Sequence, residues 1–325
     1  MAVYNSEIAA AQLSAAMQQP AVVNEIFQLA TNNSIAMTKA RRLPNMATTT
    51  ARMSVLNLLP IAYFQATGTT LKQTTKAAWV GQTITAEELA VIVPISENVL
   101  ADAVNIDIWG EIKPLVAEAM GLAIDAAVFH GTNLPATWLT DSGGTSKSLV
   151  AGATAASTTI AEGTNLDLYD DIFGEDGVMS LVEQQGFIVD GHAAAPSLAG
   201  KLRGLRSGNE TYGAGMPVLG TDGSLGGIPI TYARNGAIDA ASALLISGDW
   251  RQLVYSVRQD ITATLANQGV VQDADGDIQY NLFQQDMVAM RFVFRLGFQI
   301  ANPVTQLSST EATRYPFAIL TPAAS

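Results

Sequence analysis

The chain has 325 residues and is acidic, with 29 acidic against 17 basic side chains and a net charge of -12. It contains no cysteine, which excludes disulfides, thiolate catalysis and zinc–thiolate sites. Only 14% of its residues are charged, against about 25% in a typical soluble domain. A surface this poor in charge favours a chain that is largely covered by neighbours, although a rigid globular protein rich in Ala and Thr would have a similar composition.

Residues 1–47 are predicted to form an N-terminal arm. Two helical stretches, 7–17 and 22–30, are separated by Pro20, and Pro44 interrupts the chain again. The start of the arm has neither the cationic region nor the compact apolar region of a secretory signal. The chain also has no run of about 18 apolar residues. We therefore expect neither a signal peptide nor a membrane span.

The arm carries one local basic cluster, made of Lys39, Arg41 and Arg42. A protein that grips duplex DNA usually presents a basic face, because much of its affinity comes from neutralising phosphates. Three cations form only a small patch. We interpret the cluster as a solvated segment or a contact with a neighbouring molecule rather than as a DNA-reading arm.

Residues 51–86 are predicted to form a long β-hairpin. An apolar strand at 55–64 leads to a tip rich in Gly, Thr and Lys at 68–76, and the return strand carries Trp79. The tip has little apolar surface with which to build a core of its own. The hairpin is therefore expected to need support from outside itself.

A short apolar strand at 89–95 precedes the longest predicted helix, which begins after Asn105 as N-cap and stops at Gly131. Apolar residues spaced four and three positions apart indicate one buried stripe, with three acidic residues away from it. The stripe comprises Ile108, Ile112, Leu115, Ala119, Leu122, Ala126 and Phe129, and the acidic residues are Glu111, Glu118 and Asp125. Pro114 is expected either to kink this helix or to lie in its first turn.

The middle of the chain contains a predicted connection followed by a second predicted compact unit. Residues 131–164 are rich in Gly, Ser, Thr and Ala and are predicted to be an exposed, mobile connection. A second compact unit follows, with a helix over 168–185, a buried strand at 187–189 and a helix over 196–205. This alternation indicates an α+β or α/β layered domain, roughly 160–257.

From residue 257 onward the pattern is typical of strands. Between 289 and 300 the apolar side chains alternate with others that include Arg291 and Arg295, a period of two that places the aromatic residues on one face. Such a face must be covered, and the helix after Asn105 is the natural partner. The result would be a helix-on-sheet domain assembled from both halves of the sequence.

Several motifs occur in an order typical of a known family. They are AWVGQ at 78–82, VIVPISENVLADA at 91–103, GGIPI at 226–230, LLISGDW at 244–250 and DMVAMRFVFRLGFQI at 286–300. In this order they resemble the major capsid proteins of tailed double-stranded-DNA bacteriophages, which have the Hong Kong 97 type of fold. Gln82 departs from the family pattern, in which an acidic residue is common after the Trp-Val-Gly.

The resemblance implies an α+β fold with four parts. These are an N-terminal arm (1–47), an extended β-hairpin arm (48–88), a peripheral domain with a long spine helix packed on a β-sheet (89–159 and 258–325), and an axial domain (160–257). In the family the hairpin arm lies across the adjacent subunit. The residues that we expect at assembly interfaces are therefore Lys72, Lys76 and Trp79 on the hairpin, together with Lys39, Arg41 and Arg42.

The implied function is structural rather than enzymatic. A major capsid protein assembles with copies of itself, through hexameric and pentameric rings, into an icosahedral shell around a double-stranded DNA genome. Portal, scaffolding and cement proteins are further expected partners, and the DNA is enclosed without sequence-specific binding. The implied location is the virion, after assembly in the host bacterial cytoplasm. An encapsulin-like nanocompartment shell, which shares the fold but encloses cargo enzymes, is the alternative.

Few residues favour catalysis, and we expect no catalytic residue, cofactor or bound metal. His130 and His192 are placed at a helix end and in a loop after a strand, and no hydrolase or phosphate-binding motif accompanies them. The acidic residues at 167–176 would suit a carboxylate or metal site in a soluble α+β enzyme, but a helix start explains most of them. The alternating aspartates at 273–277 fail the EF-hand pattern, which favours a polar loop between strands.

One covalent possibility comes with the resemblance alone. Some members of the family join subunits through a Lys of the hairpin arm and an Asn of the neighbour's peripheral domain, assisted by a carboxylate. Here Lys72 or Lys76 and Asn302 would be the reacting residues. No carboxylate can be assigned from the sequence, so solvated or salt-bridged lysines are the favoured interpretation.

Overall fold

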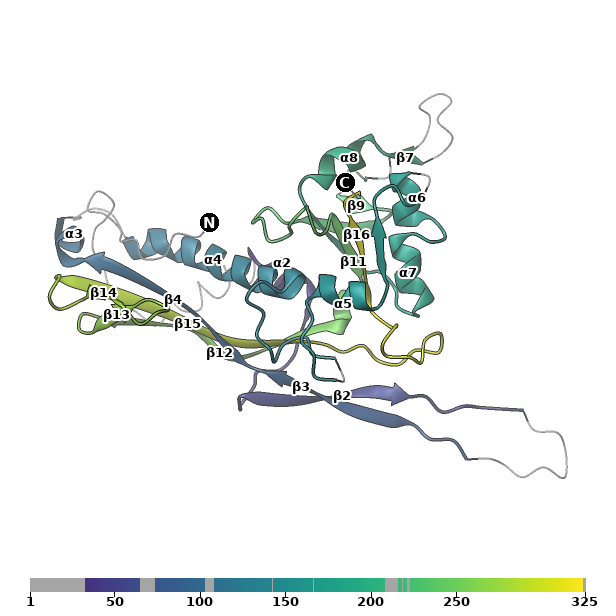
Figure 1. Cartoon of the computed structure of the whole chain (residues 1–325), viewed down its shortest axis with the longest axis horizontal. Helices are drawn as coiled ribbons and strands as arrows, with labels where there is room; N and C mark the ends of the chain where they lie inside the picture. The colour runs from purple at the N-terminus through teal and green to yellow at the C-terminus, as the bar shows by residue number, and fades with distance from the viewer. Residues whose placement is uncertain are drawn as a thin grey trace.

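The computed structural model describes residues 33–64, 74–102, 108–141, 143–165, 167–207, 216–217, 219–220 and 223–323. Two sheets organise these residues: a four-stranded sheet in the order β1-β12-β15-β4 and a six-stranded sheet in the order β5-β16-β11-β6-β10-β9. The four-stranded sheet is long and extends away from the compact six-stranded part, to the left in Figure 1, whereas a separate hairpin projects to the lower right. Because helices lie against both sheets, the predicted α+β class is confirmed.

The four-stranded sheet is built from two distant stretches of sequence. Its strands are β1 (Arg41–Arg42), β4 (Glu87–Ser96), β12 (Leu253–Ala266) and β15 (Met287–Ile300). Strand β15 lies in the centre and pairs antiparallel with both β12 and β4. The alternation predicted for 289–300 is confirmed, since Phe292, Phe294 and Phe298 are buried on one face.

Helix α4 (Ile108–His130) covers that aromatic face, as the sequence predicts. Its partners there belong to one core cluster that contains residues of α4, β12 and β15. Gly131 follows the helix at a φ of 76°, a conformation that glycine adopts easily, which confirms the predicted stop. Pro114 lies inside the helix, and the expected N-cap, Asn105, is outside the described residues.

The predicted buried stripe of α4 is correct at its two ends and wrong between them. Leu115 is 64% exposed, and Ala119 and Leu122 are also exposed. The positions that are buried in their place, four residues apart, are Val116, Met120 and Ile124. Because an α-helix has 3.6 residues per turn, side chains four positions apart are displaced slightly around its axis. The buried face therefore spirals around α4. The physical reason is that α4 packs on the sheet, on α2 (Ile35–Lys39) and on α5 (Leu149–Ala155) along its length.

The six-stranded sheet is mixed. Its strands are β5 (Thr159–Ala161), β6 (Gly191–Ala194), β9 (Ser224–Leu225), β10 (Ile228–Tyr232), β11 (Leu245–Gly248) and β16 (Phe317–Thr321). Strand β11 pairs antiparallel with β6 and β16, whereas β10 runs parallel to β6 and β16 parallel to β5. Helices α6 (Leu168–Phe173), α7 (Val178–Gln184) and α8 (Leu198–Gly204) lie beside this sheet and share a second core cluster with it.

Of three local expectations for this region, two need correction and one is confirmed. The helix predicted over 168–185 is two helices, α6 and α7, because Gly174 and Gly177 interrupt it and the Gly174 N–H caps α6 by donating to Asp170 O at 2.8 Å. The strand predicted at 187–189 begins at Gly191 instead, although Phe187 and Val189 are buried as expected. The helix predicted over 196–205 is confirmed as α8.

The connection at 131–164 is not the exposed, mobile loop that its composition predicts. It contains α5, whose Leu149 and Ala153 are fully buried, and strand β5. Ser148 caps α5 by accepting a hydrogen bond from Ala151 N. The small residues serve close packing: a Cβ at Gly152 would collide with the Tyr315 hydroxyl, so the glycine makes room for that ring.

Candidate functional site

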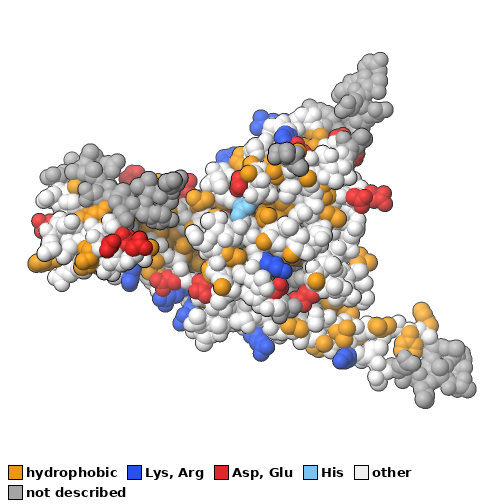
Figure 2. All heavy atoms as spheres, viewed as in Figure 1, with side chains coloured by type: hydrophobic (Ala, Val, Ile, Leu, Met, Phe, Trp, Pro, Cys, Tyr) orange, Lys and Arg blue, Asp and Glu red, His pale blue; other side chains and the backbone are white. Residues whose placement is uncertain are grey.

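The projecting hairpin consists of β2 (Thr50–Leu58) and β3 (Ala78–Thr85), which pair antiparallel as the sequence predicts. The first strand begins and ends earlier than the predicted 55–64, and residues 59–64 continue it without strand pairing. Large apolar side chains on and beside these strands are exposed, and Figure 2 shows hydrophobic side chains along this arm. They are Leu58, Ile61, Tyr63, Phe64, Trp79 and Val80. We call these six residues the hairpin apolar set. Large exposed apolar patches are typical of surfaces that contact another molecule, so this set is a candidate interface.

Two of the residues expected at assembly interfaces lie on this arm. Trp79 is opposite Leu56 in the strand register and is 65% exposed, so it fills no intrachain core. Lys76 is exposed just before β3. Lys72 lies outside the described residues. Trp79 and Lys76 are therefore both exposed on the arm, and whether either meets a neighbouring subunit stays a prediction.

The basic cluster divides into two environments. Arg41 and Arg42 form the exposed strand β1, which pairs parallel with β12, and Arg42 Nη2 donates to Asn45 Oδ1 at 3.0 Å. Lys39 is turned inward, with Nζ 5.5 Å from the centroid of the Trp250 ring. Burial lowers the pKa of Lys39, and the nearby Asp190 carboxylate opposes this effect. Of the three residues, only the two arginines are exposed, and their contact with a neighbour stays a prediction.

A buried carboxylate that sequence reasoning missed joins three parts of the molecule. Asp125, in α4, was expected on the exposed side of the helix but is fully buried. It accepts hydrogen bonds from Ser34 Oγ at 2.7 Å, Ile35 N at 2.9 Å, Ala36 N at 2.9 Å and Asn235 Nδ2 at 3.0 Å. Burial raises the pKa of Asp125, and these four hydrogen bonds lower it again in part. Asp125 thus fastens the start of α2 and the loop near Asn235 to α4.

The histidines occupy structural positions. His130 ends α4 as expected, and its Nε2 accepts from Asp239 N at 3.0 Å. His192 was expected in a loop but lies within β6, fully buried, with Nδ1 2.8 Å from Ser247 Oγ. Burial, together with the charge of Lys39, lowers the pKa of His192 to about 4, so its ring is neutral at pH 7. Ser247 is also fully buried, so this pair cannot meet a substrate.

The acidic clusters are used for local structure. Asp167 caps α6 by accepting from Asp170 N, and the buried Asp171 accepts from Gly163 N at 2.7 Å and Asn165 N at 2.9 Å. The aspartates at 273–277 form the predicted turn between β13 (Val270–Gln272) and β14 (Ile278–Asn281). Within the described ranges, no three His, Asp or Glu residues converge where a metal ion could bind, and no helix is long and apolar enough to cross a membrane.

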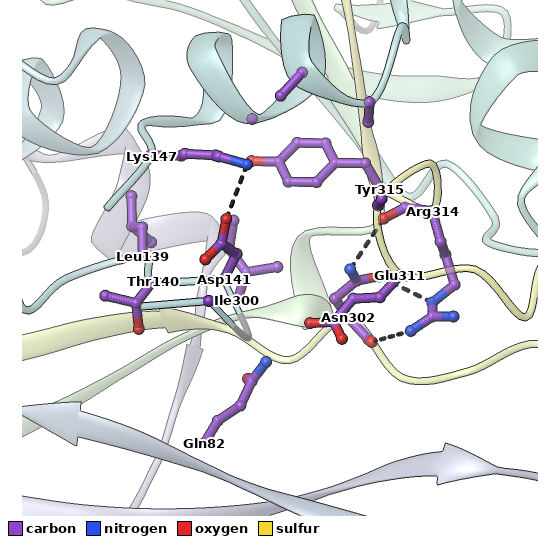
Figure 3. A pocket seen from close by; sticks show the side chains of 15 residues that line it. Gln82, Leu139, Thr140, Asp141, Lys147, Ile300, Asn302, Glu311, Arg314 and Tyr315 are labelled. Atoms are coloured by element: carbon purple, nitrogen blue, oxygen red, sulfur yellow. Dashed lines mark hydrogen bonds and ion pairs between the residues drawn. The ribbon is translucent and has the colours of Figure 1, made fainter. Parts of the chain in front are cut away.

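A cavity of about 270 Å³ lies where the hairpin root, the loop at 139–147, α5 and the segment at 300–315 meet (Figure 3). Lys147 Nζ forms an ion pair with Asp141 Oδ2 at 2.9 Å on one side of it. On the other side the buried Arg314 donates to Asn302 Oδ1 at 3.2 Å, Asn302 O at 3.1 Å and Ser308 O at 3.1 Å.

Asn302, the expected acceptor of a covalent link, is part of this cavity. Both ends of its amide are engaged by Arg314, since Nδ2 donates to Arg314 O at 2.9 Å. Glu311 lines the same cavity and is a carboxylate that the sequence alone did not connect with Asn302. A link from Lys72 or Lys76 would require Asn302 to leave Arg314, and the hypothesis of a covalent bond stays a prediction.

Comparison with known proteins adds independent findings. The model of the family described as "Phage capsid family" matches residues 15–304 of this chain. A curated relative, the "Major capsid protein" of Staphylococcus phage 80alpha, is 27% identical over 253 residues, which cover 75% of this chain and 69% of the relative.

Several solved structures resemble this chain over nearly its whole length. A structure from Microbacterium phage Oxtober96 is 36% identical with a TM-score of 0.74, and the match covers 89% of this chain and 91% of that one. A structure from Mycobacterium phage Adephagia is 27% identical with a TM-score of 0.74 and coverage of 98% and 95%. The structure titled "Capsid of empty GTA particle computed with C5 symmetry" is 16% identical, with a TM-score of 0.57 and coverage of 98% and 95%, which shows a likeness of fold.

Proposed function

The chain belongs to the phage capsid family, and from this premise we propose that copies of it form hexameric and pentameric rings that close into an icosahedral head shell. It is a major capsid protein of a phage, with the Hong Kong 97-type fold that the motifs predict. Members of such a family are structural proteins rather than enzymes. The family match and the curated relative favour the phage head over the nanocompartment alternative.

The exposed hairpin apolar set is the observation that carries this proposal. A two-stranded hairpin is at best marginally stable alone in water, and this one leaves Trp79 and Phe64 without an intrachain core. Burying a large apolar side chain is worth about 1.5–3 kcal/mol. A neighbouring subunit that covers the arm would gain that stabilisation at several side chains, and many such modest interfaces acting together would hold a shell.

The excess of acidic over basic residues supports enclosure of DNA without tight binding. The chain has 29 acidic and 17 basic residues, and duplex DNA affinity depends on neutralising phosphates. We therefore propose an inner wall that repels the packaged genome weakly, so that the DNA can move without adhering. Strong, salt-sensitive binding of duplex DNA by isolated subunits would contradict this part of the proposal.

The four-part division of the chain belongs to the same proposal. The parts remain the N-terminal arm, the hairpin arm, the peripheral domain and the axial domain, with two adjustments. Residues 253–257 begin β12 of the four-stranded sheet, so we group them with the peripheral domain. Strand β16 pairs with β11 and β5 in the six-stranded sheet, so residues 317–321 group with the axial rather than the peripheral domain. Portal, scaffolding and cement proteins are proposed partners, and assembly in the host cytoplasm before incorporation in the virion is the proposed route.

Electron microscopy of the full chain tests the function directly. The chain would be expressed alone and together with a scaffolding protein from the same genome, and the purified products imaged. We expect closed shells of uniform size in at least one of the two preparations. A product that remains monomeric at high concentration in both preparations would contradict the proposal.

Covalent joining of subunits is tested on the same particles. Denaturing gel electrophoresis of mature shells should give a clean monomer band, because Asn302 is occupied by Arg314. A ladder of multimers that disappears in the Lys72→Arg or Lys76→Arg variant would instead establish the link and identify its lysine.

A further inference from the structure

Helix α4 carries an exposed apolar stripe in its middle. Leu115 is 64% exposed and Leu122 is 38% exposed. Ala119 and Ala123 are also exposed, and Ala126 is partly exposed. Spacings of three and four positions place these five residues, which we call the α4 stripe, on one side of the helix. The sequence pattern is that of a buried face, yet the described part of the chain leaves this face uncovered.

The shape of the α4 stripe suits another helix. Its alanines let a second helix approach to an interaxial distance of about 8–10 Å, with the leucines as larger contacts. Ala123 and Ala126 also border a hollow of about 210 Å³ between α4, the start of β4 and the loop at 132–138. From 115 to 126 the stripe is roughly 16 Å long, which is about three turns of helix. One short helix would therefore cover it.

The chain itself passes directly beside the α4 stripe. A Cβ at Gly121 would lie 3.2 Å from both Asn33 C and Ser34 N. Ser34 is held there, because its Oγ donates to Asp125 Oδ1 at 2.7 Å. Figure 1 accordingly shows α2 alongside α4. Since Leu122 follows Gly121 in the helix, the chain that precedes Asn33 starts from a fixed point next to the stripe.

The segment before that point has a matching apolar pattern. The helices expected over 7–17 and 22–30 lie outside the described residues. In 22–30 the apolar residues with the i, i+3, i+4, i+7 spacing of one helix face are Val23, Ile26, Phe27 and Ala30. As a helix the segment would be about 13 Å long. The connection from 30 to 33 can span about 10 Å, which is the distance between the axes of packed helices.

The covalent connection favours this segment over a partner from another molecule. A short flexible linker gives a tethered segment an effective concentration in the millimolar range. A helix as short as 22–30 is marginal in water by itself, so it needs a surface on which to bury its apolar face. The α4 stripe is such a surface within reach.

We propose that residues 22–30 lie as a helix on the α4 stripe of the same chain, with Ile26 and Phe27 turned toward it. The inference goes beyond the capsid function and does not require assembly. It makes this part of the N-terminal arm a cover of the long helix, and leaves residues 1–21 as the part of the arm that can extend to a neighbour.

Paired cysteines test the position of the segment in the unassembled full chain. The chain has no cysteine of its own, and a disulfide requires Cα atoms within about 7 Å. Ala119→Cys would be combined in turn with Val23→Cys, Ile26→Cys and Phe27→Cys, and the oxidised chains run on a non-reducing gel. We expect at least one pair to give a monomer of altered mobility in most of the chains.

Ala119→Cys with Asn24→Cys is the matched control. Asn24 is on the opposite side of the predicted helix, so this pair should link at least fivefold less. No link in any of the three pairs, or equal linking in the control, would overturn the inference. A disulfide-linked dimer in place of the altered monomer would also overturn it, because the stripe would then hold the segment of a second copy.

Denaturant unfolding supplies a second test. Phe27→Ala and Leu122→Ala should each lower the folding equilibrium constant roughly 5- to 30-fold. The double variant should lose much less than the product of the two effects, because residues in contact are coupled. Gln28→Ala should have no effect. Independent effects of Phe27→Ala and Leu122→Ala would show that these side chains do not meet and would contradict the proposal. Shell formation enters neither test, so their failure would leave the proposed capsid function intact.

Discussion

The strand pair β12–β15 and the hairpin β2–β3 are both long antiparallel ladders, yet they differ in what covers them. Helix α4 lies on the aromatic face of β15, and Phe292, Phe294 and Phe298 are buried there. Among the described residues, no helix shares a core cluster with the hairpin, and Trp79 and Phe64 are exposed. Since strands are stabilised by what packs on their faces, one ladder is stable within the subunit and the other depends on a neighbour. The following predictions test that difference.

Phe294→Ala should give the largest effect on the subunit. The side chain is fully buried between β15 and α4, and its truncation leaves a cavity in the main core. We expect the free energy of unfolding to fall by about 3–5 kcal/mol, as measured by denaturant unfolding of the unassembled chain. A loss below about 1 kcal/mol would mean that neighbouring side chains fill the space left by the Phe294 ring. The β12–β15 ladder would then not be the rigid one of the two ladders.

Asp125→Ala should weaken the subunit by about 3 kcal/mol, because several buried donors lose their shared acceptor. Hydrogen exchange should show the loss at 33–40 and around Asn235 before it reaches β15. Glu118→Ala, at an exposed position of the same helix, is the matched control and should be nearly neutral. Equal effects of the two substitutions would contradict the fastening role of Asp125.

Acid should destabilise the subunit through His192. Its folded-state pKa is about 4 against an ordinary value near 6.5, so the unfolded chain binds the proton more readily. The stability contributed by the neutral ring is present above pH 6.5 and is lost as the pH falls toward 4. We expect a loss of about 2 kcal/mol between pH 7 and pH 5 from this group. The His192→Gln variant, measured in parallel, should lose that part of the pH dependence, and an unchanged slope would contradict the assignment.

Trp79→Ala should have the opposite effect to Phe294→Ala, with little loss of subunit stability and a clear loss of shell assembly. Because Trp79 fills no intrachain core, unfolding of the subunit should change by less than about 1 kcal/mol, whereas each interface should lose about 2 kcal/mol. Shell yield at a fixed subunit concentration measures the second effect. Unchanged yield combined with a large loss of subunit stability would place Trp79 in the subunit core.

Lys76→Ala should have the smallest effect. The side chain is exposed, and exposed lysines contribute within about 0.5 kcal/mol. Neither unfolding nor shell formation should change measurably in 0.15 M salt. A clear assembly defect would show that Lys76 makes a specific contact with a neighbour and would add a polar anchor to the hairpin.

The elements whose patterns are local could be predicted from the sequence. The alternation at 289–300, the end of α4 at Gly131 and the hairpin with exposed Trp79 depend on periodicity and turn residues. The errors arose where distant segments decide burial. Asp125 is buried because Ser34 and Asn235, 91 and 110 residues away in sequence, bring donors to it. No pattern within α4 could reveal them.

Composition also fails to predict burial where distant segments of the chain pack together. The small residues at 131–164 suggest a loose loop, but their smallness lets Tyr315 pack against Gly152 from another part of the chain. His192 was misplaced because β6 is short and its partners, β10 and β11, follow later in the sequence. The family resemblance depended instead on the order of motifs, which survives such local errors.

Hydrogen–deuterium exchange of the two ladders, in free subunits and in assembled shells, tests the central claim most directly. Amides of β12 and β15 should be protected in both states, because α4 covers them within the subunit. Amides of β2 and β3 should exchange rapidly in the free subunit and slowly in the shell. Equal and strong protection of the hairpin in both states would contradict the claim that a neighbouring copy stabilises it.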